Sequence, residues 1–143
     1  MRLMVAAFVV LGLLGPLTDK SVGPGDVTIT IDKITANDKI RGRVRGLTGT
    51  DPQAYKVLVY VHTDLWYVHP WAGQGKGRSW AAVENDGSWR LKSLQREFKA
   101  NKIAALVVRR SYPEPHRLAD VRSIPHEAIV IKDLVGTPDF GKV

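Results

Sequence analysis

Cysteine is absent from the 143 residues of the chain. Without cysteine, no disulfide can cross-link the fold, and neither thiolate chemistry nor a zinc site with cysteine ligands is possible. A lipoprotein anchor is excluded as well, because the lipid of such an anchor is carried by a cysteine. The folded part of the chain must therefore depend on its hydrophobic core for stability.

Catalytic signatures are also missing. The sequence contains neither a G-x-S-x-G nor an H-E-x-x-H motif. The carboxylates available for acid-base chemistry near the aromatic part of the chain are Asp64 with Glu84 or Asp86. We therefore expect a protein that is not an enzyme and that needs no cofactor.

The apolar run near the N-terminus is too short to cross a membrane. It has 13 uncharged residues, 3–15, whereas a membrane-spanning helix needs about 20. Arg2 before the run, and the small residues Ser21 and Gly23 after it, predict a signal peptide over residues 1–23 and a secreted or periplasmic protein without a transmembrane span. Two alternatives stay open: an apolar arm that packs on its own domain, or an uncleaved anchor retained at the membrane.

Acidic residues are in deficit. The chain has 14 Asp and Glu against 21 Lys and Arg, a formal charge of +7, and loss of Arg2, Asp19 and Lys20 with the signal peptide would leave +6. Such an excess favours anionic partners: acidic polysaccharide, a phospholipid surface or nucleic acid. Since export disfavours nucleic acid, we expect a polysaccharide, another envelope component or a protein as the partner.

Strand periodicity dominates the rest of the chain. Residues 27–32 and 39–46 alternate between apolar or small and polar side chains, as half-buried antiparallel strands do. Segments 55–64 and 103–108 are apolar on both faces, which is typical of central strands. We expect these four segments to be strands, the last two in the core.

The clearest turn signal is Asn85-Asp86-Gly87. It predicts a three-residue hairpin loop with Gly87 in the left-handed conformation, Val83 paired with Trp89, and Ala81 paired with Leu91. Because side chains alternate along a strand, this register puts Trp80 on the face away from Trp89.

The four segments, the two hairpin strands at 79–84 and 88–92, and a last strand at 127–132 make seven short strands without βα alternation. A loop or helical turn at 94–102 and a short helix at 116–123 complete the expected elements. The pattern predicts an all-β, antiparallel, immunoglobulin-like β-sandwich over residues 24–135, followed by a tail, 136–143.

A resemblance supports this fold. The G-x-V-x-G pattern of Gly42, Val44 and Gly46, the strand 55–61 and the segment 86–89 (Asp-Gly-Ser-Trp) resemble the immunoglobulin-like accessory domains of secreted bacterial proteins. The resemblance covers roughly residues 26–110, and the chain lacks both cysteines of the Cys-Trp-Cys arrangement of antibody domains. It implies a fold and transfers no site residue.

Aromatic and ionisable side chains are most concentrated in residues 62–80, which hold three of the four tryptophans. Aromatic faces stack on sugar rings, and neighbouring polar groups bond the hydroxyls, so this segment predicts carbohydrate binding. The alternative is that the aromatic side chains fill one end of the sandwich. The candidate ligand-binding residues are Trp66, Tyr67, Trp71, Arg78 and Trp80.

The sequence contains two further candidate sites. His62, Asp64 and His69 are candidate metal ligands, although their spacing fits no standard signature and hydrogen-bonded histidines are the simpler explanation. Alternate cations on segment 39–46, and Lys76 and Arg78 of the glycine-rich loop 73–78, are candidates for contacts with an anionic group. The alternative for that cationic stripe is a solvated edge strand. The candidate anion-binding residues are Arg41, Arg43, Arg45 and Lys76.

Taken together, the sequence predicts an exported, non-catalytic binding module, with carbohydrate or cell-envelope glycan as its ligand and the aromatic segment as its site. The alternative is a structural or protein-interaction β-sandwich whose aromatic side chains are internal.

Overall fold

The computed structural model describes residues 26–35, 38–47, 51–70, 78–93 and 99–134. The predicted signal peptide and C-terminal tail lie outside these residues. The described part is all-β, with two short 3-10 helices, and contains no helix long and apolar enough to cross a membrane. Its elements are β2 (Thr28–Ile34), β3 (Lys39–Arg45), η3 (Pro52–Ala54), β4 (Tyr55–His62), β5 (Trp66–Val68), β6 (Trp80–Ala82), β7 (Ser88–Lys92), β8 (Lys102–Arg109), β9 (Arg117–Leu118), η4 (Val121–Ser123) and β10 (Ala128–Asp133).

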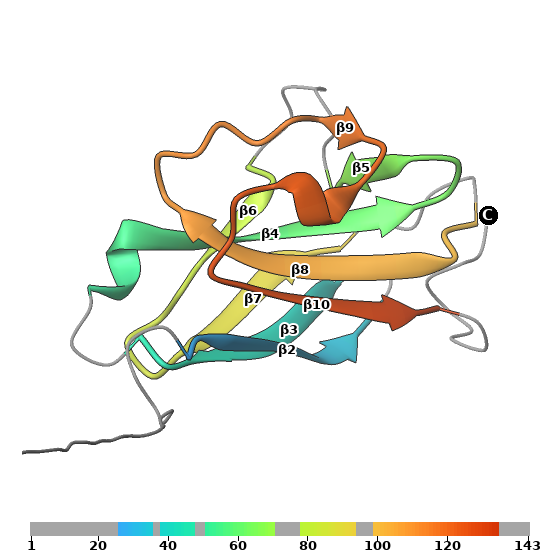
Figure 1. Cartoon of the computed structure of the whole chain (residues 1–143). Coiled ribbons are helices and arrows are strands. Elements are labelled where there is room, and N and C mark those ends of the chain that lie inside the picture. The colour runs from blue at the N-terminus through green and yellow to red at the C-terminus, as the bar shows by residue number, and fades with distance from the viewer. Residues whose placement is uncertain (1–25, 36–37, 48–50, 71–77, 94–98, 135–143) are drawn as a thin grey trace, which may run out of the picture.

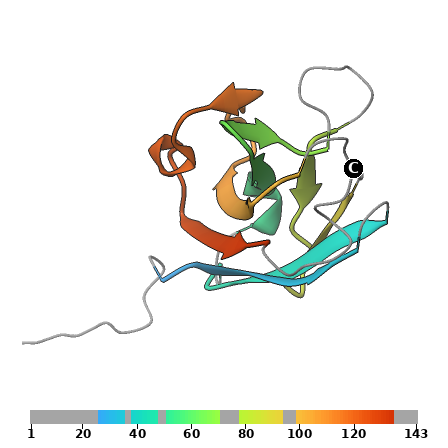
Figure 2. The ribbon, with the colours of Figure 1, turned by 90° about the vertical axis from the view of Figure 1, so that its right-hand side faces the viewer.

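The strands form two antiparallel sheets that pack face to face (Figures 1 and 2). The small sheet has the order β2-β3-β7. The large sheet has the order β10-β8-β4-β5-β9. β5 and β6 share one edge of β4: β6 pairs with its first half and β5 with its second half. The predicted all-β, antiparallel sandwich is therefore confirmed at this level.

The small sheet owes its position to the period-two pattern of its strands. Ile29 and Ile31 of β2, and Ile40 and Val44 of β3, are buried against the large sheet, and Trp89 of β7 joins them. The residues between them in the sequence face the other way and are mostly exposed. β3 lies between β2 and β7, so the expectation of an edge strand was wrong.

The large sheet is apolar on both faces because it is covered on both sides. Alternate residues of β4 and β8 join two different clusters: Val57 and Val107 face the small sheet, whereas Leu58 and Leu106 face away from it. All four are fully buried. The prediction that these two segments are core strands is confirmed.

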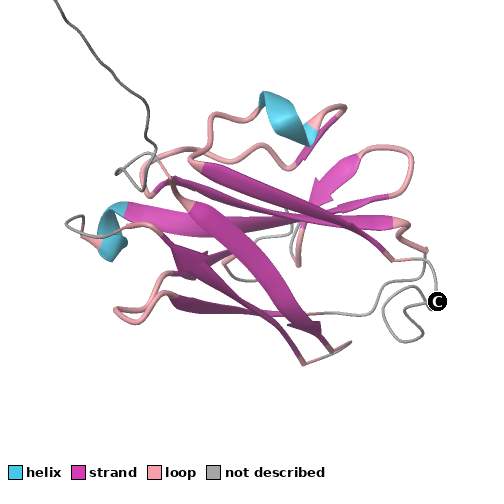
Figure 3. Cartoon of the chain, turned by 60° about the horizontal axis from the view of Figure 1, so that its bottom comes forward, coloured by secondary structure: helices cyan, strands magenta, loops and turns pink. Residues whose placement is uncertain are grey.

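The layer over the far side of the large sheet is segment 110–127, which carries β9 and η4 (Figure 3). Val121 and Ile124 of this segment are buried against the large sheet. Burial raises the pKa of the Tyr60 hydroxyl, which donates a hydrogen bond to the Pro115 carbonyl at 2.7 Å. The outer core, as we call this cluster, comprises Leu58, Tyr60, Trp66, Val68, Ala104, Leu106, Val108, Val121 and Ile124.

The turn at 85–87 joins the two sheets instead of closing a ladder. Glu84 N–H bonds Ser88 O and Gly87 N–H bonds Glu84 O, both at 2.9 Å, and Gly87 has φ +87°, so the predicted turn is confirmed. Beyond it the strands separate: β6 pairs with β4 and β7 with β3, and the expected β6–β7 ladder is missing from the described residues. Trp80 and Trp89 do contact different cores, as predicted.

Two short strands, β5 and β9, had no sequence signal. β5 pairs with β4 along its whole length and with β9 through Trp66–Leu118 and Tyr67–Arg117. The helix expected at 116–123 is reduced to η4, because residues 117–118 pair with β5 instead.

Candidate functional site

The outward face of the small sheet is densely cationic. Side chains of directly paired residues lie on the same face of a sheet. The strand register therefore puts β2, β3 and β7 cations side by side: Lys33 opposite Arg41, Arg41 opposite Arg90, and Lys39 opposite Lys92. The cationic face, as we call this surface, comprises Lys33, Lys39, Arg41, Arg43, Arg45, Arg90 and Lys92.

Among the described residues, no carboxylate forms an ion pair with these cations. The ion pair present among the described residues is Lys56–Glu114, which lies elsewhere. On the cationic face itself, the Arg43 guanidinium donates to the backbone carbonyl of Asp86 at 3.1 Å. Like charges directly opposite each other destabilise a sheet, and a surface of this sign is complementary to a negatively charged ligand.

A hollow of about 310 Å³ opens on this surface. Its lining includes Arg41, Arg43 and Arg90, but also the carboxylates Asp32 and Glu84. Trp89 reaches it from the core side, where its ring packs so closely on Gly42 that a Cβ there would lie 2.7 Å from Cζ2. The cationic face is therefore not flat at this point. Glycine at position 42 leaves room for the Trp89 indole.

Ser88 holds the Asp86 side chain in the turn at one end of the cationic face. The Ser88 hydroxyl and backbone N–H both bond Asp86 Oδ1, at 2.7 and 2.9 Å. These bonds, with a smaller contribution from Arg43, lower the pKa of Asp86. The carboxylate thus stays ionised and is committed to the turn.

The predicted aromatic platform divides into internal and external parts. Trp66 is only 6% exposed and belongs to the outer core, so its ring is no surface for stacking. Tyr67 is partly exposed, and its hydroxyl donates to Asp64 Oδ1 at 3.0 Å. Hydrogen bonds from Thr63, Tyr67 and Leu65 lower the pKa of Asp64. The hydrogen bond between Tyr67 and Asp64 raises the pKa of the Tyr67 hydroxyl.

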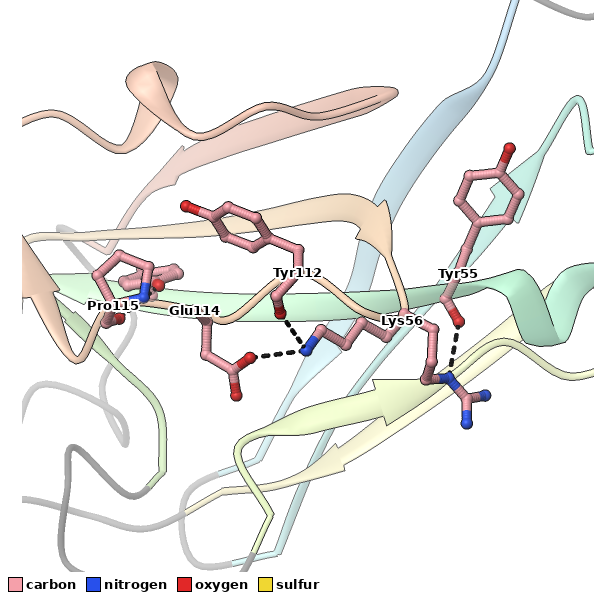
Figure 4. A network of polar contacts seen from close by, with 7 residues as sticks. Tyr55, Lys56, Tyr112, Glu114 and Pro115 are labelled. Carbon is pink, nitrogen blue, oxygen red and sulfur yellow. Dashed lines mark hydrogen bonds and ion pairs between the residues drawn. The ribbon is translucent and has the colours of Figure 1, made fainter.

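Trp80 is half-buried and surrounded by cations. The Arg78 and Arg110 guanidinium carbons lie 4.1 and 4.6 Å from its ring centroid, and Lys56 Nζ lies 5.7 Å away. Lys56 is buried and donates to Glu114 Oε1 and to the Tyr112 carbonyl, each at 2.7 Å (Figure 4). Segment 110–127 is thereby fastened over the large sheet.

The candidate metal ligands are not gathered. His62 bonds Asn101 Oδ1 at 2.8 Å and packs on Trp66, with ring centroids 4.9 Å apart. His69 is 1% exposed, and Asp64 is held by its hydroxyl and amide neighbours. Within the described ranges, no group of three or more potential ligands is suitable for a metal ion.

Trp71 and Lys76, the remaining candidates, lie outside the described residues. Three residues of the cationic face, Lys33, Arg90 and Lys92, were not predicted from the sequence as site members, and neither was the Arg110 contact with Trp80. The alternation S-W-R-L-K of β7 was a usable signal for Arg90 and Lys92. Their position beside the arginines of β3 depends on strand pairing, which no local pattern encodes.

Comparison with known proteins adds no constraint: the chain matches no family model, no curated protein and no solved structure.

Proposed function

We propose that the chain is an exported, non-catalytic binding module that holds an acidic polysaccharide of the cell envelope on its cationic face. The observation that carries the proposal is the register of β3 and β7, which puts Arg41 opposite Arg90 and Lys39 opposite Lys92. Cation pairs of this kind cost stability in a free sheet, and a polyanion relieves the repulsion.

The spacing of the cationic face suits an extended polymer. Alternate residues of one strand are roughly 7 Å apart, and neighbouring strands roughly 5 Å. The face thus offers a two-dimensional array of charges instead of one enclosed pocket. No described side chain of β3 or β7 on this face is an exposed aromatic or aliphatic anchor, so the interaction is electrostatic and should weaken strongly with salt.

An immunoglobulin-like topology and removal of a signal peptide belong to the same proposal. The order β2-β3-β7 facing β10-β8-β4 supports the topology. In an immunoglobulin domain, the first, second and fifth strands share one sheet, while the third, sixth and seventh share the other. The apolar run at 3–15 supports the signal peptide.

Binding to polygalacturonate, a polymer of carboxylated sugars, tests this function. We expect saturable binding to the full chain that falls as salt is raised, and loss of most of it in the double variant Arg41→Gln/Arg90→Gln. The matched control is Arg117→Gln/Arg122→Gln, which removes the same charge from exposed positions of segment 110–127. Equal loss in both variants would show that net charge alone is responsible and would refute the site.

Three further probes decide the chemical class. Neutral dextran should not bind. Tighter binding of duplex DNA, or of vesicles containing anionic phospholipid, than of polygalacturonate would reject the polysaccharide proposal.

The second candidate is a structural or protein-interaction sandwich with internal aromatic side chains. It is favoured by the burial of Trp66 and Trp89, which are 6% and 2% exposed. Absence of polyanion binding, together with capture of a defined envelope protein, would favour it.

A further inference from the structure

A second cation cluster lies on the other side of the sandwich, around Trp80. The indole packs against the outer core, on the face of the large sheet that points away from the small sheet. Arg78 approaches it from the residues just before β6, Arg110 from the end of β8, and Lys56 from β4. Three separate segments thus bring a positive charge to a single ring.

The charges in this cluster are not equally compensated. Lys56 is neutralised by Glu114, and the Tyr112 carbonyl accepts a further bond from it. Arg110 makes a long hydrogen bond of 3.4 Å from Nε to the Tyr55 carbonyl. Within the described ranges, no carboxylate forms an ion pair with Arg78 or Arg110. Two guanidinium charges therefore stay without a counter-charge there.

Stacking on an indole orients a guanidinium without using its hydrogen-bond donors. The flat face contacts the ring, while the N–H groups project from its edge in a fixed plane. This fork matches the two oxygens of a carboxylate or a phosphate. Since both guanidinium carbons lie within 5 Å of one centroid, the two groups are at most about 9 Å apart.

We propose that Arg78 and Arg110, stacked on Trp80, form a binding site for an oxyanion group, a carboxylate or a phosphate. The site shares no residue with the cationic face and lies on the opposite outer side of the sandwich, so it does not depend on the proposed function. With both sites occupied, the module joins two anionic partners through one rigid body.

The test is a titration of the full chain with inorganic phosphate and, separately, with acetate, at constant ionic strength. Side-chain N–H resonances of arginine and tryptophan report the binding by NMR. We expect saturable shifts at Trp80, Arg78 and Arg110, with millimolar affinity. Arg78→Gln and Arg110→Gln should each weaken the affinity by about tenfold, as loss of a charge-assisted hydrogen bond does. Tighter binding of phosphate assigns a phosphoryl ligand, and tighter binding of acetate a carboxylate.

The control is Arg122→Gln, an exposed arginine of segment 110–127 that does not contact Trp80. It should leave the titration unchanged. Shifts that do not saturate with either anion, or an equal loss of affinity in Arg122→Gln, would overturn the proposal. Trp80→Phe, which keeps a ring for stacking, should retain more affinity than Trp80→Leu if the ring orients the guanidinium groups.

Two variants keep this site distinct from the proposed function. Arg41→Gln/Arg90→Gln should keep the phosphate or acetate shifts while losing polygalacturonate. Arg78→Gln/Arg110→Gln should lose the shifts while keeping the polymer bound to the cationic face. Failure of one site therefore leaves the other open to its own test.

Discussion

The two sheets of the sandwich differ in their outer faces. Each sheet packs one face into the central core, and its second face points outward. The small sheet fills its second face with cations and exposes it, whereas the large sheet fills its second face with apolar side chains and covers it with segment 110–127. The covered side, under segment 110–127, therefore contributes apolar burial to stability, whereas the bare side, the cationic face, contributes little.

The largest expected effect is that of a cavity beneath segment 110–127, which we call the cover. Leu106 is fully buried in the outer core, so Leu106→Ala should lower the free energy of unfolding by about 2–5 kcal/mol. Arg41→Gln, on the bare side, should change it by no more than about 0.5 kcal/mol. Urea denaturation of the two variants measures both. Similar losses would mean that the bare side is also structural.

The next largest effect is expected from the ion pair of Lys56 and Glu114, which holds segment 110–127 on the large sheet. Glu114→Gln removes the counter-charge of the buried Lys56 and should cost about 1.5–3 kcal/mol, the worth of a hydrogen bond to a charged group. Combining Lys56→Met with Glu114→Leu should recover most of that loss, because no buried charge is left unpaired. Glu127→Gln, an exposed carboxylate on the same segment, is the matched control. A double variant no more stable than Glu114→Gln would contradict the account.

A smaller effect is expected at the turn that connects the two sides. Gly87 has φ +87°, and a Cβ there would lie 2.3 Å from the Val44 carbonyl oxygen. Gly87→Ala should therefore destabilise the protein by at least the roughly 1–2 kcal/mol that a left-handed backbone costs, because the chain must also shift away from the Val44 oxygen. Asn85→Ala, at an exposed position of the same turn, should cost much less. The thermal midpoints of the two variants provide the measurement.

The bare side should respond in the opposite direction when its repulsion is relieved. Arg90→Glu places a carboxylate opposite Arg41 and should raise the free energy of unfolding by about 0.2–1 kcal/mol. The same variant should bind polygalacturonate more weakly, so stability and binding would change in opposite senses. A variant that is both less stable and equally active in binding would show that the like-charge pairs carry no strain.

The smallest effect is a loss of stability in acid. Hydrogen bonds lower the pKa of Asp64 and of Asp86 in the folded chain, relative to an unfolded value of about 3.9. A depressed folded pKa contributes stability that is complete above the unfolded value and lost as pH falls through the folded value. The urea midpoint should thus drop below about pH 4. Asp64→Asn and Asp86→Asn should each reduce this drop, and unchanged pH dependence in both would refute the assignment.

Much of the fold was predictable because its signals are local. Alternation in β2 and β3, and the two-sided apolar character of β4 and β8, follow from which faces are buried, and Gly87 marks its own turn. β5 and β9 were not predictable, because three- and two-residue strands exist only through their pairing. The separation of β6 from β7 likewise depends on β3 and β4 as stronger partners.

The candidate site was predicted only in part, for the same reason. The alternate arginines of β3 were visible in the sequence, and so was the charge of the chain. Trp66 and Trp80 were visible as aromatic residues, but which ring is internal depends on where segment 110–127 lies.

The class of fold and the cationic side of β3 follow from local patterns, since period-two alternation is a property of a single strand. Tertiary contacts were needed to establish that β3 is central, that Arg90 and Lys92 complete its charged face, and that Arg110 stacks on Trp80 beside Arg78. Those contacts join residues far apart in the chain, and their formation depends on the packing of whole sheets.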